Sequence, residues 1–558
     1  MKFIHRQYFY ALIYRGKLIM NKKKSYAILL FLILTQVIVS LARVPSNGSI
    51  NPPNILFVFS DDHAWQSIGA YGGRLKEVAH TPHIDKLASE GMLFRKCFVA
   101  NALCGPSRAA VLTGKYGHRN GVTWNRNTNF DGSQQTFPKI LRKNGYQTAI
   151  IGKWHLASVP TGFDYFDVMK GQGRYYNPFL QRGNAEGLQD TRTVVGYNSD
   201  IVGDLTIEWL KNGRDKSKPF MLMSQFKATH HGFCPGPDEY DLYDDIHIPE
   251  PDNLFDDFSY RGTAIREQTL TLYKNLSHSI LVGDPGELGK LNPDQRKAWD
   301  AYRSKFSKPF QAMNLNWNDQ NRELSRFKYQ ALLKNFLASG AGIDKNVGRI
   351  RAFLQENDLA DNTIVVYMAD HGFFLGEHGF FDKRFMYEES LRTAFIVHWP
   401  GQVEAGVVND QDIVSNIDIA STFLEMAGIE IPQEIQGRSM VPVLQGKTPD
   451  NWRKTFLYTY HELANHNVQP HFGVTDGRNK LIYYPKYNEW EFFDLKKDPQ
   501  EMISQYFIPE NKTVITKLKK ELVRLRNQYH CPPIITHRNM NKKANWDYEK
   551  RIIPIGVK

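Results

Sequence analysis

Acidic and imidazole side chains follow two apolar runs of the chain, in positions where they could hold a cation. Asp61 and Asp62 come after the run 54–60, and Asp370 and His371 come after the run 363–368. Carboxylate oxygens are ligands of divalent cations such as Ca²⁺ and Mg²⁺. Either pair alone is as typical of a solvated turn, but carboxylates gathered at one place repel each other without a cation. Together they predict a site for a divalent cation.

The segment from Cys104 to Gly114 combines a thiol with the expected start of a helix. Pro106 is favoured in the first turn of a helix, so we expect Cys104 just ahead of the helix N-terminus. The free N–H groups there attract anions, and Arg108 offers a planar guanidinium to an oxyanion. From the residues alone, Cys104 is either an activated thiol beside an anion site or a buried structural cysteine.

Four apolar runs alternate with helix-like stretches, and each run ends in polar residues. The runs are 54–60, 147–151, 220–226 and 363–368. The expected helices cover 83–91, 137–144, 201–212 and 345–357. This alternation predicts an α/β fold with a large, mostly parallel mixed sheet sandwiched by helices. Because ligands bind outside the carboxyl ends of such strands, the polar groups after the four runs should meet at one edge.

Two regions depart from this pattern. Residues 232–330, rich in Pro, Asp and aromatic residues, are predicted to form an insertion with loops and one or two helices, which either lines a site or only packs. Short alternating runs predict a smaller C-terminal α+β unit with an antiparallel sheet over 451–530, including a helix over 514–529. Residues 52–450 are then the main domain, and 531–558 a tail.

The composition excludes several classes of protein. A chain of 558 residues with 42 % apolar residues can bury a large core, and a mean hydropathy of −0.46 excludes a polytopic membrane protein. Four cysteines are too few for a disulfide scaffold. Of the Lys and Arg behind the net charge of +12, eight lie within residues 1–43, which hold no Asp or Glu. The basic excess therefore does not indicate a nucleic-acid partner.

The basic start of the chain is typical of an export signal. Lys22, Lys23 and Lys24 precede the apolar run 27–39, which is shorter than a membrane span requires. We therefore predict a signal peptide over 1–42, with Met20 as a possible start, and a periplasmic or secreted protein without a stable membrane span. An uncleaved anchor is the alternative.

Two signatures in the chain resemble those of the type I sulfatases, members of the alkaline-phosphatase-like superfamily. Cys104-x-Pro-Ser-Arg108, followed by Leu112-Thr-Gly114, is similar to the first. Gly145-Tyr-x-Thr, followed by Gly152-Lys-Trp-His155, is similar to the second. The order of the polar residues also follows the family over about residues 52–500.

The resemblance implies a sulfuric ester hydrolase in which Cys104 is oxidised after translation to formylglycine. One hydroxyl of the hydrated aldehyde attacks sulfur, and the other expels sulfate and restores the aldehyde. The family also implies one Ca²⁺ per chain, held by Asp61, Asp62, Asp370 and His371, with the converted Cys104 as a further ligand. Asn is commoner than His at the last of these positions.

The same resemblance implies roles for residues around the nucleophile. Arg108 and Lys153 would stabilise the deprotonated diol, and His155 would assist its proton transfers. His63 and Lys227 are expected to support the site or to be structural.

A sugar alkoxide is a poor leaving group and needs an acid. His230 and Lys383 resemble the family pair that binds the bridging oxygen and protonates it. His231 is the nearest competitor of His230, and Arg384 is the alternative to Lys383.

Candidate contacts to the sugar are aromatic, basic and amide residues near these motifs. They are His118, Arg119, Arg174, Tyr175, Tyr176, Asn177, His466 and His471. The implied substrate is a sulfated polysaccharide or its oligosaccharides, with an algal glycan such as ulvan favoured and a glycosaminoglycan as the alternative. Phosphoester hydrolysis within the same superfamily and a carbohydrate-binding protein on an inactive scaffold are the other hypotheses. A formylglycine-generating or sulfatase-maturating enzyme is the implied partner.

Overall fold

The computed structural model describes residues 52–125, 129–283, 285–462 and 465–532, and its residues from Pro53 onward form one compact unit. The predicted signal peptide over 1–42 and all but the first two residues of the predicted tail lie outside the described residues. In the described part of the chain, no helix has the length and apolarity that crossing a membrane requires.

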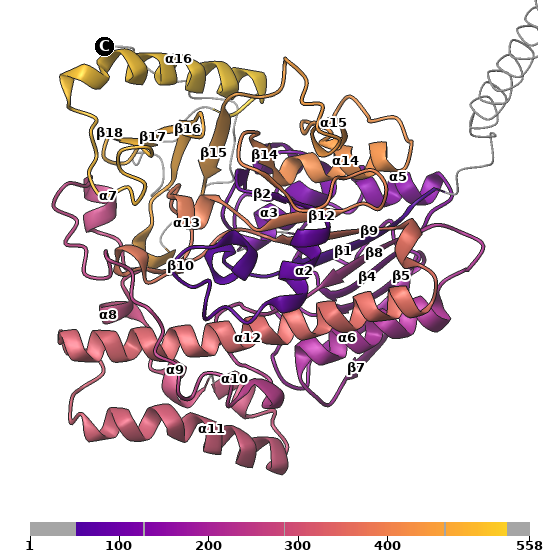
Figure 1. Ribbon diagram of the computed structural model, residues 1–558, viewed down its shortest axis with the longest axis horizontal. Coiled ribbons are helices and arrows are strands. Elements are labelled where there is room, and N and C mark those ends of the chain that lie inside the picture. The colour runs from indigo at the N-terminus through magenta and orange to yellow at the C-terminus, as the bar shows by residue number, and fades with distance from the viewer. Residues whose placement is uncertain (1–51, 126–128, 284, 463–464, 533–558) are drawn as a thin grey trace, which may run out of the picture. The chain divides into compact units, whose positions relative to one another are not determined.

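A ten-stranded mixed sheet lies at the centre of this unit (Figure 1). Its strands are β1 (Asn54–Ser60), β2 (Met92–Phe94), β4 (Gln147–Lys153), β5 (Tyr165–Met169), β6 (Phe179–Asn184), β7 (Gly187–Thr193), β8 (Phe220–Gln225), β9 (Thr363–Ala369), β12 (Phe395–His398) and β13 (Val407–Asn409). They are ordered β13-β2-β12-β9-β1-β8-β4-β5-β6-β7. The five neighbours from β9 to β5 run parallel, and antiparallel pairing begins on either side of them. The predicted mostly parallel mixed sheet is confirmed.

Helices cover both faces of the sheet, because the central strands are apolar on both sides. In β1, Leu56 and Val58 pack into one core, while Ile55, Phe57 and Phe59 pack into the other. The first core is closed by α2 (Pro82–Glu90), α6 (Asn198–Glu208) and α12 (Arg322–Glu356). The second is closed by α3 (Cys104–Thr113), α5 (Phe137–Lys143), α14 (Ile419–Met426) and α15 (Val441–Leu444). Side chains that alternate along one strand thus serve two helical layers.

The long helix α12 differs from its prediction. The sequence predicted a helix over 345–357, whereas α12 begins at Arg322, with the Asn321 side chain accepting hydrogen bonds from the N–H groups of Glu323 and Leu324. The helix continues through Gly340, where an added Cβ would lie 3.1 Å from Nε2 of His63. Close packing against His63, which follows β1, leaves little room for a side chain at this point of the helix.

The insertion is more helical than the one or two helices predicted for it. It contains α7 (Thr263–Arg266), α8 (Leu272–Asn275), α9 (Ser279–Val282), α10 (Pro285–Leu288) and α11 (Pro293–Ala312). Four of these helices are single turns, which lack the length over which a hydrophobic period can be recognised. Figure 1 shows α9 and α10 between α11 and α12, and Tyr302 and Arg303 of α11 donate hydrogen bonds to Asn335 of α12.

The C-terminal residues form the predicted antiparallel sheet. Its four strands are β15 (Phe456–Tyr460), β16 (His471–Thr475), β17 (Asn479–Tyr484) and β18 (Glu489–Asp494), followed by helix α16 (Lys512–Gln528). Leu518, Leu522 and Leu525 of α16 pack into the core that this sheet shares with residues after Cys104. All four cysteines are free thiols, so the described fold contains no disulfide.

Candidate active site

The predicted acidic residues meet at the carboxyl edge of the sheet. Strands β1 and β9 are parallel neighbours with Ser60 opposite Ala369, so Asp61 and Asp370 leave the sheet side by side. The backbone N–H of Asp62 donates to Oδ1 of Asp370 at 3.0 Å. Asp62 has a φ of 60°, a left-handed conformation that Asp tolerates better than most residues. This turn places both neighbouring carboxylates at the same edge.

The acidic cluster has the donor set of a divalent-cation site. One oxygen each of Asp61, Asp62 and Asp370 lie within 4.8 Å of one another, and all three side chains are buried. Burial and the charge of Asp61 raise the pKa of Asp370 well above its usual value. Oδ1 of Asp61 accepts no hydrogen bond from the described residues. Buried carboxylates that repel each other and keep a free oxygen fit a hard cation.

His371 lies where a fourth ligand would be placed. Its Nε2 is 3.2 Å from Oδ1 of Asp62 and 3.5 Å from Oδ1 of Asp370. Burial lowers the pKa of His371 to about 4, so the imidazole is neutral, as a metal ligand must be. Its Nδ1 lies 2.9 Å from the carbonyl oxygen of Gly372, which leaves Nε2 for the cluster.

Cys104 lies against the acidic cluster. It is the first residue of α3 rather than the residue just ahead of it, and its side chain is buried. Its Sγ lies 3.8 Å from Oδ1 of Asp62 and 3.5 Å from Nε2 of His371. Burial and the charge of Asp61 raise the pKa of the Cys104 thiol well above its ordinary value. In this structure the nearby carboxylates and burial therefore favour the neutral thiol, against the preference for a thiolate that a helix N-terminus creates.

Three cations pair with the carboxylates of the cluster, and Arg108 pairs with two of them, since its Nη2 also lies 3.6 Å from Oδ1 of Asp61. Arg108 donates from Nη2 to Oδ2 of Asp370 at 3.1 Å. Lys153 pairs with Asp61. Nζ of Lys383 lies 2.8 and 2.6 Å from the two oxygens of Asp62. Arg108 lies in α3, Lys153 ends β4, and Lys383 follows β11 (Phe381–Asp382). Only the folded chain therefore brings the three cations together.

The two predicted catalytic histidines border the same cluster. One nitrogen of His230 lies within 4.8 Å of ligand atoms of Asp61 and Cys104. Burial, helped by the charge of Lys153, lowers the pKa values of His230 and His155 well below normal. Nδ1 of His155 has no hydrogen-bond partner among the described residues. The lowered pKa values keep both imidazoles neutral, and Nδ1 of His155 is left for proton transfer, whereas Nδ1 of His230 lies 3.3 Å from the carbonyl oxygen of His231.

Two glutamines of the site were missed by sequence reasoning. Oε1 of Gln172 accepts a hydrogen bond from Nζ of Lys153 at 2.6 Å, and the side-chain oxygen of Gln225 accepts one from Arg108. Glutamine carries no catalytic signature, but Gln172 stands between Gly171 and Gly173, which have φ values of 62° and 71°. A Gly-x-Gly turn after a strand was the available signal.

His63 and Lys227, expected to support the site, are both buried close to it. Nδ1 of His63 lies 2.5 Å from the hydroxyl oxygen of Tyr367 in β9, behind the acidic edge. The Lys227 ammonium lies 4.9 Å from the centre of the Tyr175 ring.

A second group of charges lies beside Lys383. Arg384, the predicted alternative contact, pairs with Asp382 and lies 3.6 Å from Glu462, while Nε2 of His466 lies 3.2 Å from Oδ2 of Asp382. Asp382 itself lies 3.2 Å from Nζ of Lys383. Polar side chains from the main domain and from the C-terminal unit therefore meet next to the acidic cluster.

The other predicted sugar contacts differ in what surrounds them. His118 lies 2.8 Å from the carbonyl oxygen of Tyr529, and His471 is buried among aromatic rings such as Tyr460 and Tyr484. The hydroxyl of Tyr175 donates to the carbonyl of His230 at 2.5 Å. The hydroxyl of Tyr176 donates to the carbonyl of Pro235, and the side chain of Asn177 pairs with that of Gln295. Arg119 and His231 are exposed, and Arg174 is half-buried. The structure thus brings His466 and Tyr175 to the site, and gives His118, His471 and Asn177 packing partners.

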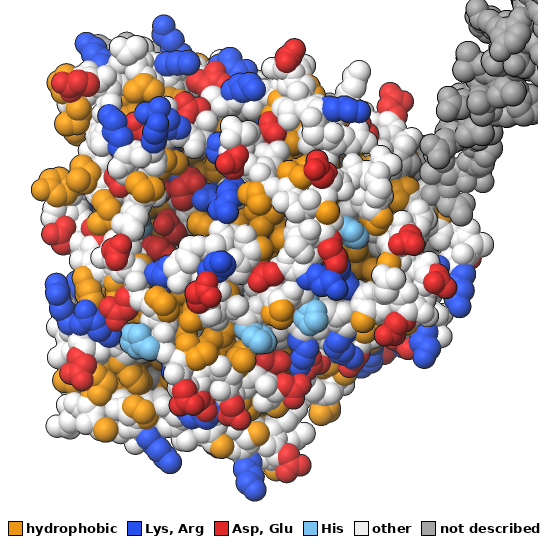
Figure 2. All heavy atoms as spheres, viewed as in Figure 1, with side chains coloured by type: hydrophobic (Ala, Val, Ile, Leu, Met, Phe, Trp, Pro, Cys, Tyr) orange, Lys and Arg blue, Asp and Glu red, His pale blue; other side chains and the backbone are white. Residues whose placement is uncertain are grey.

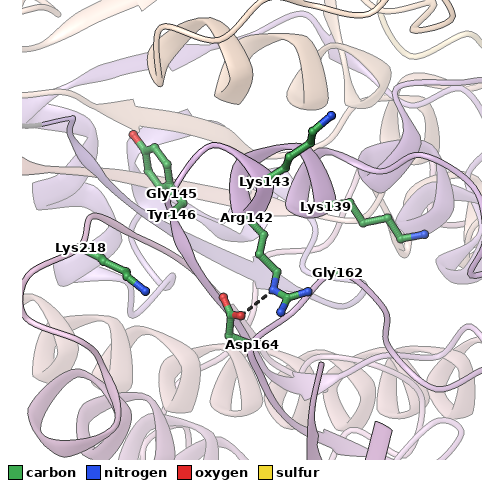
Figure 3. A pocket seen from close by; sticks show the side chains of 8 residues that line it. All are labelled: Lys139, Arg142, Lys143, Gly145, Tyr146, Gly162, Asp164 and Lys218. Carbon is green, nitrogen blue, oxygen red and sulfur yellow. Dashed lines mark hydrogen bonds and ion pairs between the residues drawn. The ribbon is translucent and has the colours of Figure 1, made fainter. Parts of the chain in front are cut away.

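A separate basic cavity of about 530 Å³ lies at the other end of β4. It is lined by Lys139, Arg142, Lys143, Gly145, Tyr146, Gly162, Asp164 and Lys218 (Figure 3). Figure 3 shows Arg142 directed at Asp164, and the two side chains pair at 2.6 Å. Because Tyr146 precedes β4 whereas Lys153 ends it, this cavity is not part of the acidic site.

On the face seen in Figure 2, cations are interspersed with anions.

Most of the chain matches the models of two known protein families. The model of the family described as "Sulfatase" matches residues 53–429. A second model, described as "N-sulphoglucosamine sulphohydrolase, C-terminal", matches residues 376–528.

Individual relatives agree with this assignment. An N-acetylglucosamine-6-O-sulfatase of Bacteroides thetaiotaomicron is 40 % identical over 88 % of this chain and 89 % of its own. An arylsulfatase of Clostridium perfringens is 26 % identical over 85 % of this chain and 94 % of its own. A solved structure described as a complex with "its substrate D-Glucosamine-2-N, 6-O-disulfate" superposes with a TM-score of 0.81 at 39 % identity, covering 86 % of this chain and 98 % of that one.

Proposed function

Because the chain belongs to the sulfatase family, we propose that it hydrolyses the 6-O-sulfate ester of a glucosamine residue in a glycosaminoglycan-type sugar. The observation that carries the proposal is the placement of Cys104 at the first residue of α3, against Asp62 and His371. Sulfatase activity follows from the family, while the substrate is inferred from two relatives that are 40 % and 39 % identical to this chain.

The proposed substrate, a glucosamine 6-O-sulfate, differs from the algal glycan that the sequence analysis favoured. Ulvan was favoured there, and none of the relatives reported above is named for it. The relative with 40 % identity is named for N-acetylglucosamine 6-O-sulfate, and the solved structure with 39 % identity holds a glucosamine sulfated at N2 and O6. At such identity over most of both chains, the substrate class is a better inference from these relatives than from composition. The glycosaminoglycan alternative therefore replaces ulvan.

The metal is proposed to be one Ca²⁺, held by Asp61, Asp62, Asp370 and His371. Three buried carboxylates within 4.8 Å, one with an oxygen that accepts no hydrogen bond from the described residues, support an oxygen-preferring ion. When bound, such an ion stabilises negative charge that develops on sulfate oxygens. Arg108, Lys153 and Lys383 already pair with these carboxylates, and each can then turn toward the anionic substrate.

The nucleophile is proposed to be formylglycine, formed from Cys104 by a maturation enzyme. Water adds to the aldehyde to give a diol, and one diol oxygen forms a bond to sulfur while the bond from sulfur to the sugar oxygen breaks. The sugar leaves as an alcohol after taking a proton. The second hydroxyl then loses its proton, sulfate departs and the aldehyde is restored. His155, with a free buried nitrogen close to Lys153, is proposed to accept the protons of the diol.

The proton for the leaving sugar is assigned to the pair His230 and Lys383. One nitrogen of His230 lies within 4.8 Å of ligand atoms of Asp61 and Cys104, and Lys383 approaches the cluster from β11. Their positions border Cys104 from two different loops, which supports a role at the bond that breaks. His231 is exposed, which favours His230 over its neighbour.

The domain limits and the destination of the protein remain proposals. We propose a catalytic domain over 52–450 and a C-terminal unit over 451–530 that contributes His466 to the site. Export to the periplasm or the medium is proposed from the basic and apolar residues at the start of the sequence.

The experiment is to measure sulfate release from N-acetylglucosamine 6-sulfate, N-acetylgalactosamine 6-sulfate and ulvan oligosaccharides, using protein co-produced with a maturation enzyme. We expect kcat/KM for the glucosamine sulfate to exceed the others by at least about 100-fold, since a site that binds specific hydroxyls rejects an epimer strongly. Higher activity on ulvan or on the galactosamine sulfate would contradict the proposed substrate.

A further inference from the structure

The side chain of Glu287, in the insertion, accepts hydrogen bonds from the backbone of a loop that borders the active site. Both carboxylate oxygens of Glu287 lie 3.0 Å from the backbone nitrogen of Tyr175, and one lies 3.3 Å from that of Tyr176. A carboxylate that accepts from two consecutive N–H groups forms charge-assisted hydrogen bonds and fixes the direction of the chain. The loop 171–177 is thus fixed by α10, a helix more than 100 residues away in sequence.

A second contact from the insertion fixes the end of the same loop. The side chains of Asn177 and Gln295 form a reciprocal amide pair, with nitrogen–oxygen distances of 2.8 and 3.0 Å. Nδ2 of Asn177 also donates to the carbonyl of Lys290 at 2.7 Å. Gln295 is itself held by the capping box at the start of α11. The loop is therefore held at two points by the insertion, by Glu287 of α10 and by Gln295 of α11.

The other end of this loop contacts the catalytic residues. Gln172 accepts the hydrogen bond from Nζ of Lys153 at 2.6 Å, and Tyr175 donates to the carbonyl of His230. Gly171 and Gly173 flank Gln172 in left-handed conformations, so the turn adopts a geometry open mainly to glycine. Such a turn needs outside contacts to hold Gln172 in place.

We propose that the insertion is part of the catalytic apparatus, and that Glu287 is a positioning residue that acts through Gln172 on Lys153. Among the described residues, Nζ of Lys153 has two hydrogen-bond partners, Asp61 and Gln172. With Gln172 displaced, the ammonium would be drawn to Asp61 alone and away from the substrate anion. The hydrogen bonds described for Glu287 join it to the backbone of the loop, and the path proposed here runs from there to Gln172. The inference rests on the role proposed above for Lys153.

The test is a double-mutant cycle on Glu287→Ala and Gln172→Ala, with kcat and KM measured on the best substrate of the wild-type enzyme. Each single variant should lower kcat about tenfold while KM changes less than about threefold, because transition-state alignment is lost rather than binding. The double variant should also lose about tenfold, not 100-fold, since both changes break one path. A merely structural role of Glu287 would give independent effects that multiply.

Controls separate this path from general damage. Glu250→Gln, which removes one partner of the ion pair with Arg326 elsewhere in the insertion, should leave kcat and KM unchanged. Gln295→Ala breaks the amide pair with Asn177 and also the hydrogen bond that the Gln295 side chain accepts from the N–H of Asn292 in the capping box. Its melting temperature is therefore measured beside kcat, and a lowered kcat in the folded variant keeps the test valid if Glu287→Ala is unstable.

Two results would overturn the proposal: unchanged kcat in Glu287→Ala and Gln295→Ala, or losses that multiply in the double variant. Lys153→Met distinguishes this failure from failure of the mechanism. Full activity of Lys153→Met would refute the role of Lys153, and the proposal would fall with it. An inactive Lys153→Met beside a fully active Glu287→Ala would refute the role of Glu287 alone.

Discussion

Sγ of Cys104 lies 3.5 Å from Nε2 of His371, although the two residues are 267 positions apart in sequence. The contact joins the first turn of α3 to the turn after β9. Ser107, in the same helix, donates to the carbonyl of Asp370, and Asn416 donates to Ser107 at 2.9 Å. The nucleophile and the metal ligands are thus held by one hydrogen-bonded framework.

Cys104→Ala should abolish turnover and keep the fold. The residue is buried at the start of a helix and forms no disulfide, so a smaller side chain costs little stability. We expect sulfate release to fall at least about 1000-fold, because the nucleophile is lost. Sulfate release and thermal melting should be measured on the same sample. Activity near that of the wild type would refute the formylglycine mechanism.

His230→Ala should affect natural substrates more than activated ones. A sugar alkoxide needs a proton to leave, whereas an aryl sulfate with an acidic phenol does not. General acid catalysis contributes about 100-fold or more, so this loss should appear in kcat/KM for the sugar sulfate and be much smaller for the aryl sulfate. His231→Ala, at the exposed neighbour, is the matched control. Equal losses on both substrates would remove His230 from the acid role.

Removal of the metal should stop the reaction reversibly. Chelation leaves Asp61, Asp62 and Asp370 with only their Lys and Arg partners as counterions, so activity should be lost. Added Ca²⁺ should restore activity more fully than Mg²⁺ does, because Mg²⁺ demands stricter octahedral geometry. Metal content and sulfate release should be followed together. Asp62→Asn should lower metal affinity at least about tenfold. Full activity of metal-free protein would contradict this account.

Asp344→Asn should stabilise the protein at alkaline pH. Burial raises the pKa of Asp344 to about 7, although its carboxylate accepts hydrogen bonds from His83 and Ile84 at the start of α2. A carboxyl with a raised pKa in the folded state favours folding below its unfolded pKa, and this contribution is lost as pH rises through about 7.

The variant keeps an acceptor oxygen and cannot ionise. Its free energy of unfolding in urea, relative to wild type, should rise by at least about 1 kcal/mol between pH 5 and pH 8. Asp361→Asn, at an exposed position, is the control and should show no such rise. A pH-independent difference for Asp344→Asn would contradict the prediction.

The sequence allowed the strands and the motif residues to be predicted because both are local patterns. The run 54–60 matches β1 at both ends, and the residues after β1, β4, β8 and β9 meet at one edge because parallel neighbours share a direction. What could not be predicted depends on tertiary contacts. Gln172 has its role only because Lys153 reaches it, and Glu287 only because α10 packs against the loop before Asn177.

The electrostatic surroundings of Cys104 could not be predicted for the same reason. A helix N-terminus is a local feature that favours a thiolate, whereas Asp61 and Asp62 approach from another strand and reverse that preference. The single-turn helices of the insertion were missed for a different reason, since four residues are too few to show a period.

The most direct test of the central claim is mass spectrometry of the peptide that contains Cys104, from protein co-produced with a maturation enzyme, together with sulfate release from N-acetylglucosamine 6-sulfate. The account predicts that residue 104 has lost its sulfur and carries an aldehyde, and that sulfate release scales with the converted fraction. Sulfate release by protein in which Cys104 is wholly an unmodified thiol would contradict it.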